Sequence, residues 1–180
     1  NGDTEPGFVY ELSRRLNSDF EVAVLAPHHK NAKQFEVMNG LIVHRFRYFF
    51  PYAAEKLCYQ GGVHQNMKSM PLVRFLIPFF FVSELLSTLL LIRKYKINLI
   101  HSHWILPQGL VAAIAKKLLG IPYIATAHAG DIFPLKSKYL KFLARFALEN
   151  ADFCTANSTY TKNHIKGISK IKNIDIVPMG

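Results

Sequence analysis

Residues 98–131 read NLIHSHWILPQGLVAAIAKKLLGIPYIATAHAGD, and this stretch decides the fold class. Short apolar runs at 98–102 and 122–126 are typical of buried strands. Between them, residues 107–119 repeat apolar side chains at helical spacing and stop at Gly120, a residue that favours the end of a helix. A strand, a helix and a second strand of these lengths predict a crossover between two parallel strands.

The same alternation extends over the rest of the chain. We expect further strands at 20–26, 41–46, 152–156 and 175–178, and helices at 8–16, 138–150 and 159–168. The fold class that follows is α/β, a Rossmann-like doubly wound parallel sheet in a single domain.

Small or polar clusters follow four of the predicted strands, at the point where each strand ends. Because all parallel strands present their carboxyl ends to one crevice, we expect residues from these clusters to meet there. The clusters are His101-Ser102-His103, Ala127-His128-Ala129-Gly130-Asp131, Asn157-Ser158 and Pro178-Met179-Gly180.

Composition indicates a globular chain with an anionic partner. Half of the 180 residues are apolar, and 22 Lys and Arg against 12 Asp and Glu give a formal charge of +10. Two distant cysteines, Cys58 and Cys154, suggest neither a disulfide framework nor a cysteine zinc site, so we expect a reducing cytoplasm. The chain has no starting Met and no signal pattern, which predicts that it is an excerpt.

Residues 48–70 are expected to form an irregular insertion that mixes aromatic, glycine and sulfur side chains. An apolar helix is predicted after it, from Pro71 or Pro78 to Tyr95. Glu84 near the middle of that helix argues against a membrane span, so we expect a largely buried helix. Basic residues around these aromatic side chains predict a surface for anionic membrane lipid, although lysines are also common on ordinary solvated faces.

His128 and Asp131 are the strongest candidates for chemistry. Their small neighbours allow a ligand to approach the backbone closely. An imidazole at 128 can donate to a sugar hydroxyl or to a developing charge, and the Asp131 carboxylate can accept from another hydroxyl. The structural alternative is that Asp131 caps the following segment while His128 hydrogen-bonds a loop carbonyl.

His103 and Ser158 are candidates for lining a substrate cleft. His101 and His103 point to the same side of an extended segment, but no third ligand has matching spacing, so we expect no metal. One of these imidazoles can instead pack under Trp104. Helix capping alone explains Ser158, and a ligand role for it depends on its place at the crevice.

Gly7, which follows Pro6 and precedes a predicted helix, is a candidate cradle for phosphate. Exposed N–H groups and the positive end of a helix both attract anions. An ordinary turn is the alternative, since no G-x-G-x-x-G or P-loop pattern occurs in the chain.

Six segments of the chain carry a resemblance by their order and spacing: Pro6–Leu12, Phe20–Pro27, Ile100–Trp104, Ile124–Asp131, Asn150–Ser158 and Ile176–Gly180. Together they resemble the N-terminal domain of family 4, GT-B-fold retaining glycosyltransferases, over nearly the whole chain. Two departures from the family pattern stand out. Pro6-Gly7 offers one glycine where the family has two or three. The His-Gly-x-Asp pattern appears as His128-Ala129-Gly130-Asp131, which we interpret as an insertion of Ala129.

The resemblance implies that residues 1–180 are the acceptor-side domain of a two-domain enzyme whose donor-binding domain would begin just after Gly180. It places Gly7 near the donor phosphates and His128 near the transferred sugar, without a metal. The expected reaction moves a hexose from a nucleotide sugar to a lipid-linked or polysaccharide acceptor, in the cytoplasm or on the inner face of the cell membrane. The fragment alone is expected to be inactive.

Two other functions compete with this interpretation. One is a non-catalytic module of flavodoxin-like fold that binds a nucleotide or a phosphate ligand. The other is a nucleic-acid binder, which charge alone suggests and which we do not favour, because aromatic and basic residues beside a long apolar helix suit a membrane better.

Overall fold

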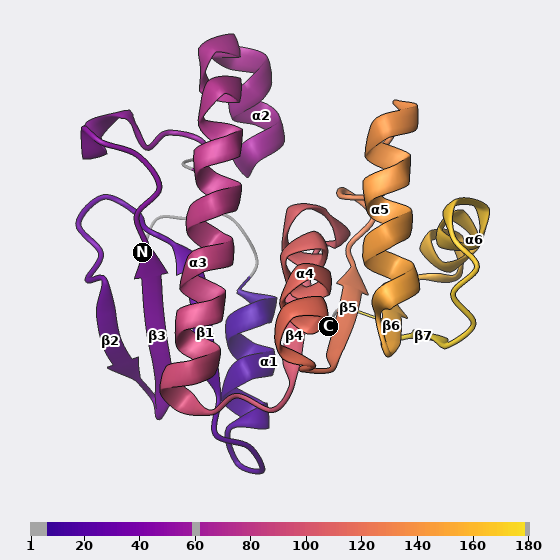
Figure 1. The fold of residues 1–180 in the computed structure, drawn as a ribbon, viewed down its shortest axis with the longest axis horizontal. Coiled ribbons are helices and arrows are strands. Elements are labelled where there is room, and N and C mark those ends of the chain that lie inside the picture. The colour runs from indigo at the N-terminus through magenta and orange to yellow at the C-terminus, as the bar shows by residue number, and fades with distance from the viewer. Residues whose placement is uncertain (1–6, 59–61, 179–180) are drawn as a thin grey trace. The chain divides into compact units, whose positions relative to one another are not determined.

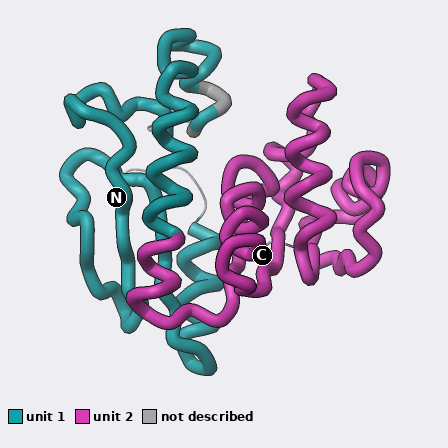
Figure 2. The backbone as a smooth tube through the Cα atoms, in the orientation of Figure 1, with its two compact units in different colours: residues 1–88 teal, residues 89–180 magenta. Residues whose placement is uncertain are grey.

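The computed structural model describes residues 7–58 and 62–178 (Figure 1). The chain divides into two compact units, residues 1–88 and 89–180 (Figure 2). Three residues of the predicted motifs, Pro6, Met179 and Gly180, lie outside the described residues.

The first unit holds a three-stranded sheet in the order β1-β3-β2. β3 pairs parallel with β1 and antiparallel with β2, a strand that the sequence analysis did not predict. The elements of this unit are α1 (Phe8–Leu16), β1 (Ala23–Pro27), β2 (Phe35–Met38), β3 (Leu41–Phe46), the 3₁₀ turns η1 (Tyr52–Ala54) and η2 (Pro71–Leu76), α2 (Gly62–Ser69) and most of α3 (Ile77–Tyr95).

A two-residue turn joins β2 to β3. Asn39 and Gly40 have φ angles of 50° and 85° and separate the paired residues Met38 and Leu41. Positive φ at both central positions is the geometry of the turn that matches strand twist, and Asn-Gly is its preferred sequence.

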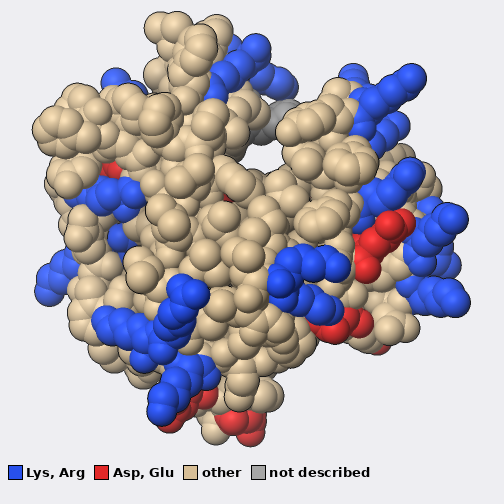
Figure 3. All heavy atoms as spheres, in the orientation of Figure 1, with Lys and Arg blue, Asp and Glu red and all other residues tan. Residues whose placement is uncertain are grey.

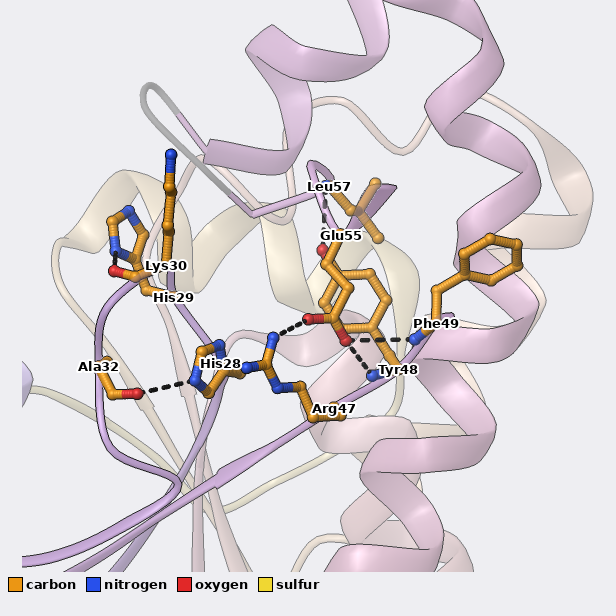
Figure 4. A network of polar contacts seen from close by, with 9 residues as sticks. All are labelled: His28, His29, Lys30, Ala32, Arg47, Tyr48, Phe49, Glu55 and Leu57. Carbon is orange, nitrogen blue, oxygen red and sulfur yellow. Dashed lines mark hydrogen bonds and ion pairs between the residues drawn. The ribbon is translucent and has the colours of Figure 1, made fainter. Parts of the chain in front are cut away.

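The insertion predicted to be irregular over 48–70 contains the 3₁₀ turn η1 and the helix α2. The loop before η1 is held by one buried carboxylate, that of Glu55 (Figure 4). Its Oε1 accepts hydrogen bonds from the backbone N–H groups of Tyr48 and Phe49 at 2.6 and 3.2 Å. Its Oε2 forms an ion pair with Arg47 at 2.8 Å. Tyr48 in turn accepts a hydrogen bond at its hydroxyl from the N–H of Leu57. These contacts give side-chain partners to the backbone N–H groups of Tyr48, Phe49 and Leu57, which have none in a strand or helix.

The expectation that the 71–95 helix is largely buried is wrong. Residues Pro71–Tyr95 are long and apolar enough to cross a membrane by length and composition, yet only 22% of their most apolar stretch is buried. One side of the helix packs in the core of the first unit through Val73, Leu76 and Phe80, against Phe46 and Tyr48. The other side is exposed, because a three-stranded sheet covers only one face of a helix.

The second unit holds a parallel sheet in the order β4-β5-β6-β7, flanked by helices. This confirms the α/β, Rossmann-like class. Gly120, at φ 73°, ends its first helix as predicted. The elements are β4 (Ile100–His103), the turn η3 (Ile105–Gly109), α4 (Leu110–Leu119), β5 (Tyr123–Ala127), α5 (Lys138–Asn150), β6 (Phe153–Ala156), α6 (Thr159–Ile168) and β7 (Ile174–Ile176).

Several alanines lie in the core of this unit beside larger apolar side chains, and small side chains allow helices to pack closely on a sheet. Asp152 links elements at the opposite end of the strands from the predicted crevice. It accepts a hydrogen bond from the Tyr123 backbone at 2.9 Å and from Lys116 of α4 at 2.7 Å. The buried alanines of the core are Ala112, Ala113, Ala125, Ala127, Ala144, Ala147 and Ala156.

Candidate functional site

The carboxyl ends of β4 and β5 bring two predicted site residues together. The two strands are parallel neighbours, with His103, the last residue of β4, paired with Thr126 of β5. His128 follows β5 directly. Parallel pairing therefore delivers both imidazoles to one edge of the sheet, where α/β proteins bind their ligands.

The two imidazoles are joined by a hydrogen bond. Nδ1 of His103 lies 3.1 Å from Nε2 of His128, so one of these nitrogens donates and the other accepts. The rings are nearly parallel, with centroids 5.3 Å apart, and the His101 ring stacks on that of His103 with centroids 4.4 Å apart. The three histidines form a short stack, and within the hydrogen-bonded pair the proton on one ring decides the tautomer of the other.

Asp131 fixes the loops that hold this pair. Its Oδ1 accepts a hydrogen bond from the backbone N–H of His128 at 2.9 Å, and its Oδ2 accepts one from Ile105 at 2.6 Å. One carboxylate thus ties the segment after β5 to the segment after β4. Burial raises the pKa of Asp131, while its backbone hydrogen bonds oppose that shift.

Two residues of these loops have positive φ without being glycine. Trp104 has φ 72° and Ala129 has φ 66°, both conformations that side chains disfavour. Hydrogen bonds hold Trp104 in place: its N–H donates to the Thr126 carbonyl and its carbonyl accepts from Gly109. Its indole lies against the His128 ring, with centroids 5.3 Å apart.

The interpretation of Ala129 as an insertion is wrong. The residue has the left-handed backbone that glycine prefers, and it stands where the His-Gly-x-Asp pattern has its glycine. Ala129 replaces that glycine, and the spacing between His128 and Asp131 is the ordinary one.

A chain of hydroxyl groups supports the stack from the strands behind it. Nε2 of His101 is 2.7 Å from Oγ1 of Thr126, which is 2.6 Å from Oγ1 of Thr155 on β6. The sequence analysis missed both threonines. The parallel register could have indicated them, because Thr126 pairs with His103 and Thr155 pairs with Thr126 on the next strand.

Both site imidazoles are held neutral. Burial lowers the pKa of His103 to about 3, and repulsion from His101 and His128 adds to the effect. Burial lowers the pKa of His128 to about 4, with a smaller effect of His101. Near neutral pH each ring is therefore an uncharged group that can donate one hydrogen bond and accept another.

The other predicted site residues have different surroundings. Ser158 caps α6, accepting a hydrogen bond at its Oγ from the N–H of Thr161 at 3.2 Å. Gly7 belongs to the first unit, where it precedes α1 and its carbonyl accepts from Glu11. Among residues 7–58 and 62–178, no three His, Cys, Asp or Glu side chains are grouped so as to hold a metal ion.

The sequence model of the family Glycosyltransferase Family 4 matches residues 8–180 of the chain. The chain belongs to that family.

The chain is also similar to a protein that is named as a glycosyltransferase. An uncharacterized glycosyltransferase of Methanocaldococcus jannaschii is 38% identical over 88 residues, which cover 48% of this chain and 24% of that protein. The matched region thus spans about a quarter of the relative's length.

Replacement of Asp131 by Asn should destabilise the family 4 domain. An amide has one acceptor oxygen, so one of the two backbone N–H groups loses its partner, at a cost of about 1–3 kcal/mol. Denaturant unfolding at neutral pH measures the loss. Asp175→Asn is the matched control, because Asp175 is exposed on β7, and its effect should stay within about 0.5 kcal/mol. Equal effects of the two substitutions would show that the Asp131 hydrogen bonds contribute nothing special.

Acid should weaken the fold through the histidine pair. The unfolded chain takes up these protons near pH 6.5, whereas the native pKa values are about 3 for His103 and about 4 for His128. The free energy of unfolding should therefore fall as the pH drops from 6.5 toward 4, by roughly 1–3 kcal/mol per histidine. In His103→Gln the loss measured by denaturant titration at several pH values should be clearly smaller. The same pH dependence in both proteins would contradict this assignment.

Proposed function

We propose that this chain is the acceptor-side half of a retaining glycosyltransferase that moves a hexose from a nucleotide sugar to a lipid-linked or polysaccharide acceptor. Family membership supports the transfer of a sugar in general. The observation that supports a reacting centre in this half is the hydrogen-bonded, neutral pair of His103 and His128 at the carboxyl ends of two parallel strands.

In this proposal His128 contacts the transferred sugar. A neutral imidazole can donate to a sugar hydroxyl, or to charge that develops on the sugar as the donor phosphate departs, and a fixed donor costs no reorganisation. His103 lines the same cleft and sets the tautomer of His128. Asp131 acts as a positioning residue, because both of its oxygens already accept backbone hydrogen bonds.

Gly7 is proposed to approach the donor phosphates with its backbone N–H. It precedes the nine-residue helix α1, whose N-terminal end favours an anion. Its φ is −73°, and a Cβ built at this position meets no described atom within 4 Å. The open space at this position leaves room for a phosphate to approach the backbone N–H.

The remaining partners belong to the same proposal. A second α/β domain would hold most of the nucleotide sugar and supply the positive charge that stabilises the leaving phosphate, so that no metal is needed. Ser158, at the end of β6, would border the acceptor cleft. A cytoplasmic location agrees with two cysteines that are both free thiols. No role for nucleic acid is proposed.

His128→Ala in the full-length enzyme should lower kcat by about 100-fold or more, the usual cost of losing one donor to developing charge. Steady-state transfer assays with the nucleotide-sugar donor measure it. His164→Ala is the matched control, because His164 lies on α6 against Phe133, and it should leave the rate near that of the unsubstituted enzyme.

An unchanged rate in His128→Ala, with an unchanged thermal melt, would remove this residue from the site. Tight nucleotide binding by residues 1–180 alone would instead favour the non-catalytic module of flavodoxin-like fold, because such a module needs a complete site within these residues.

Gly7→Ser separates a ligand role from a structural one. Serine is at least as good an N-cap as glycine, so the free energy of unfolding should stay the same or rise by about 0.3 kcal/mol. The added side chain should nevertheless obstruct a phosphate and raise the KM for the donor by about tenfold, the equivalent of one weakened hydrogen bond to a charged group. Unchanged kinetics would mean that Gly7 only begins a helix.

A further inference from the structure

We propose that the first unit binds the surface of a membrane that contains anionic lipid, through the exposed side of η2 and α3 and the adjoining loop at Phe50. The inference does not depend on the sugar-transfer reaction, since it concerns a surface outside the histidine site.

Five apolar side chains form one continuous row on this side. Their positions advance by three and four residues, which keeps them on one side of a helix. Each of the five is more than half exposed to solvent. We name this row the apolar stripe, and its members are Leu72, Phe75, Phe79, Val82 and Leu86.

The loop before η1 extends the apolar stripe with more aromatic surface. The ring of Phe49 packs on that of Phe79, with centroids 5.1 Å apart, and the next residue, Phe50, is 79% exposed. The Glu55 carboxylate holds this loop by accepting from the backbone of Phe49 (Figure 4). The aromatic side chains are therefore presented by a fixed loop, which lowers the entropy lost on binding.

Charge around the apolar stripe has a single sign at the surface. Between residues 37 and 88 the sequence has two acidic residues, Glu55 and Glu84, and both are buried. Lys56, Lys68 and Arg74 from the same stretch are exposed. Figure 3 shows a broad area without charge over α3, with Lys and Arg at its margins and little acidic surface beside it. Apolar rings framed by cations fit the boundary between lipid headgroups and acyl chains.

The packing of the opposite side favours a helix that lies along the surface over one that crosses the bilayer. Val73, Leu76 and Phe80 belong to the core of the first unit, and Glu84 is buried on the same side. A spanning orientation would remove these side chains from the core and place the carboxylate in hydrocarbon, which is costly.

The same charges disfavour other occupants. A second copy packed on this side would bring its own Lys56, Lys68 and Arg74 to a surface where residues 37–88 offer no exposed acid to pair with them. Nucleic acid would need cations at the centre of the surface, whereas here the centre is apolar and the cations are at the rim.

Vesicle co-sedimentation of the full-length protein tests the inference. The protein should pellet with vesicles of phosphatidylcholine and phosphatidylglycerol, weakly or not at all with phosphatidylcholine alone, and less as salt is added. The double variant Phe75→Ser/Phe79→Ser should lower the partition coefficient by about tenfold or more. Lys56→Gln and Lys68→Gln should each lower it by about fivefold on anionic vesicles.

Phe20→Ser is the matched control for the aromatic variants. Phe20 is 59% exposed in the same unit, but it is flanked by Asp19 and Glu21, so its replacement should not change vesicle binding. Thermal melts by circular dichroism report whether each variant is folded.

Three results would overturn the inference. Equal binding, or none, to the two kinds of vesicle by the unsubstituted protein would exclude an anionic membrane as the partner. Retention in vesicles after alkaline carbonate would indicate a spanning helix. A dimer that Phe75→Ser/Phe79→Ser dissociates, with no vesicle binding, would assign the apolar stripe to a second copy.

Discussion

The geometry of the candidate site depends on one buried carboxylate. Asp131 accepts hydrogen bonds from the backbone of His128 and of Ile105, which follow two neighbouring strands. Burying a carboxylate is costly unless its oxygens find donors, and burying an N–H is costly unless it finds an acceptor. The same two hydrogen bonds offset both costs, so the loops that follow β4 and β5 are fixed to each other. The positive φ angles of Trp104 and Ala129 persist because the surrounding contacts leave no alternative.

The first unit uses the same physical device for a different purpose. Glu55 is fully buried, and its oxygens accept from Tyr48, Phe49 and Arg47. A segment with no periodic pattern thereby gains a defined conformation. In both units a carboxylate replaces the ladder of a regular element as the partner of loop N–H groups. One such carboxylate orients imidazoles, and the other presents aromatic rings at a surface.

Burial also separates two electrostatic environments within a strongly basic chain. The formal charge is +10, yet burial keeps His103 and His128 neutral, so these two imidazoles offer hydrogen bonds without carrying charge themselves. In the first unit the exposed side of α3 has cations at its rim and no exposed acid from residues 37–88. The positive net charge of the chain is therefore a property of its surface, and it does not extend to the two neutral imidazoles of the site.

Local signals in the sequence determined the elements whose limits depend on neighbouring residues. Ser137 and Ser158 cap their helices, and Gly120 ends α4, because each contact involves residues within one turn. The strands of the second unit followed from their apolar runs. His103 and His128 could then be predicted to lie at one edge of the sheet, because parallel strands place their carboxyl ends together.

Tertiary structure decided what depends on partners distant in the chain. The hydrogen bond between His103 and His128, and the chain from His101 to Thr155, join residues 25 to 29 positions apart or on different strands. The strand β2 exists because β3 offers it a partner, although it is only four residues long and its Phe35 and Val37 are exposed. The exposure of α3 could not be predicted from its composition. An apolar composition indicates a tendency to be buried, but it does not show whether the fold has enough surface to cover the helix.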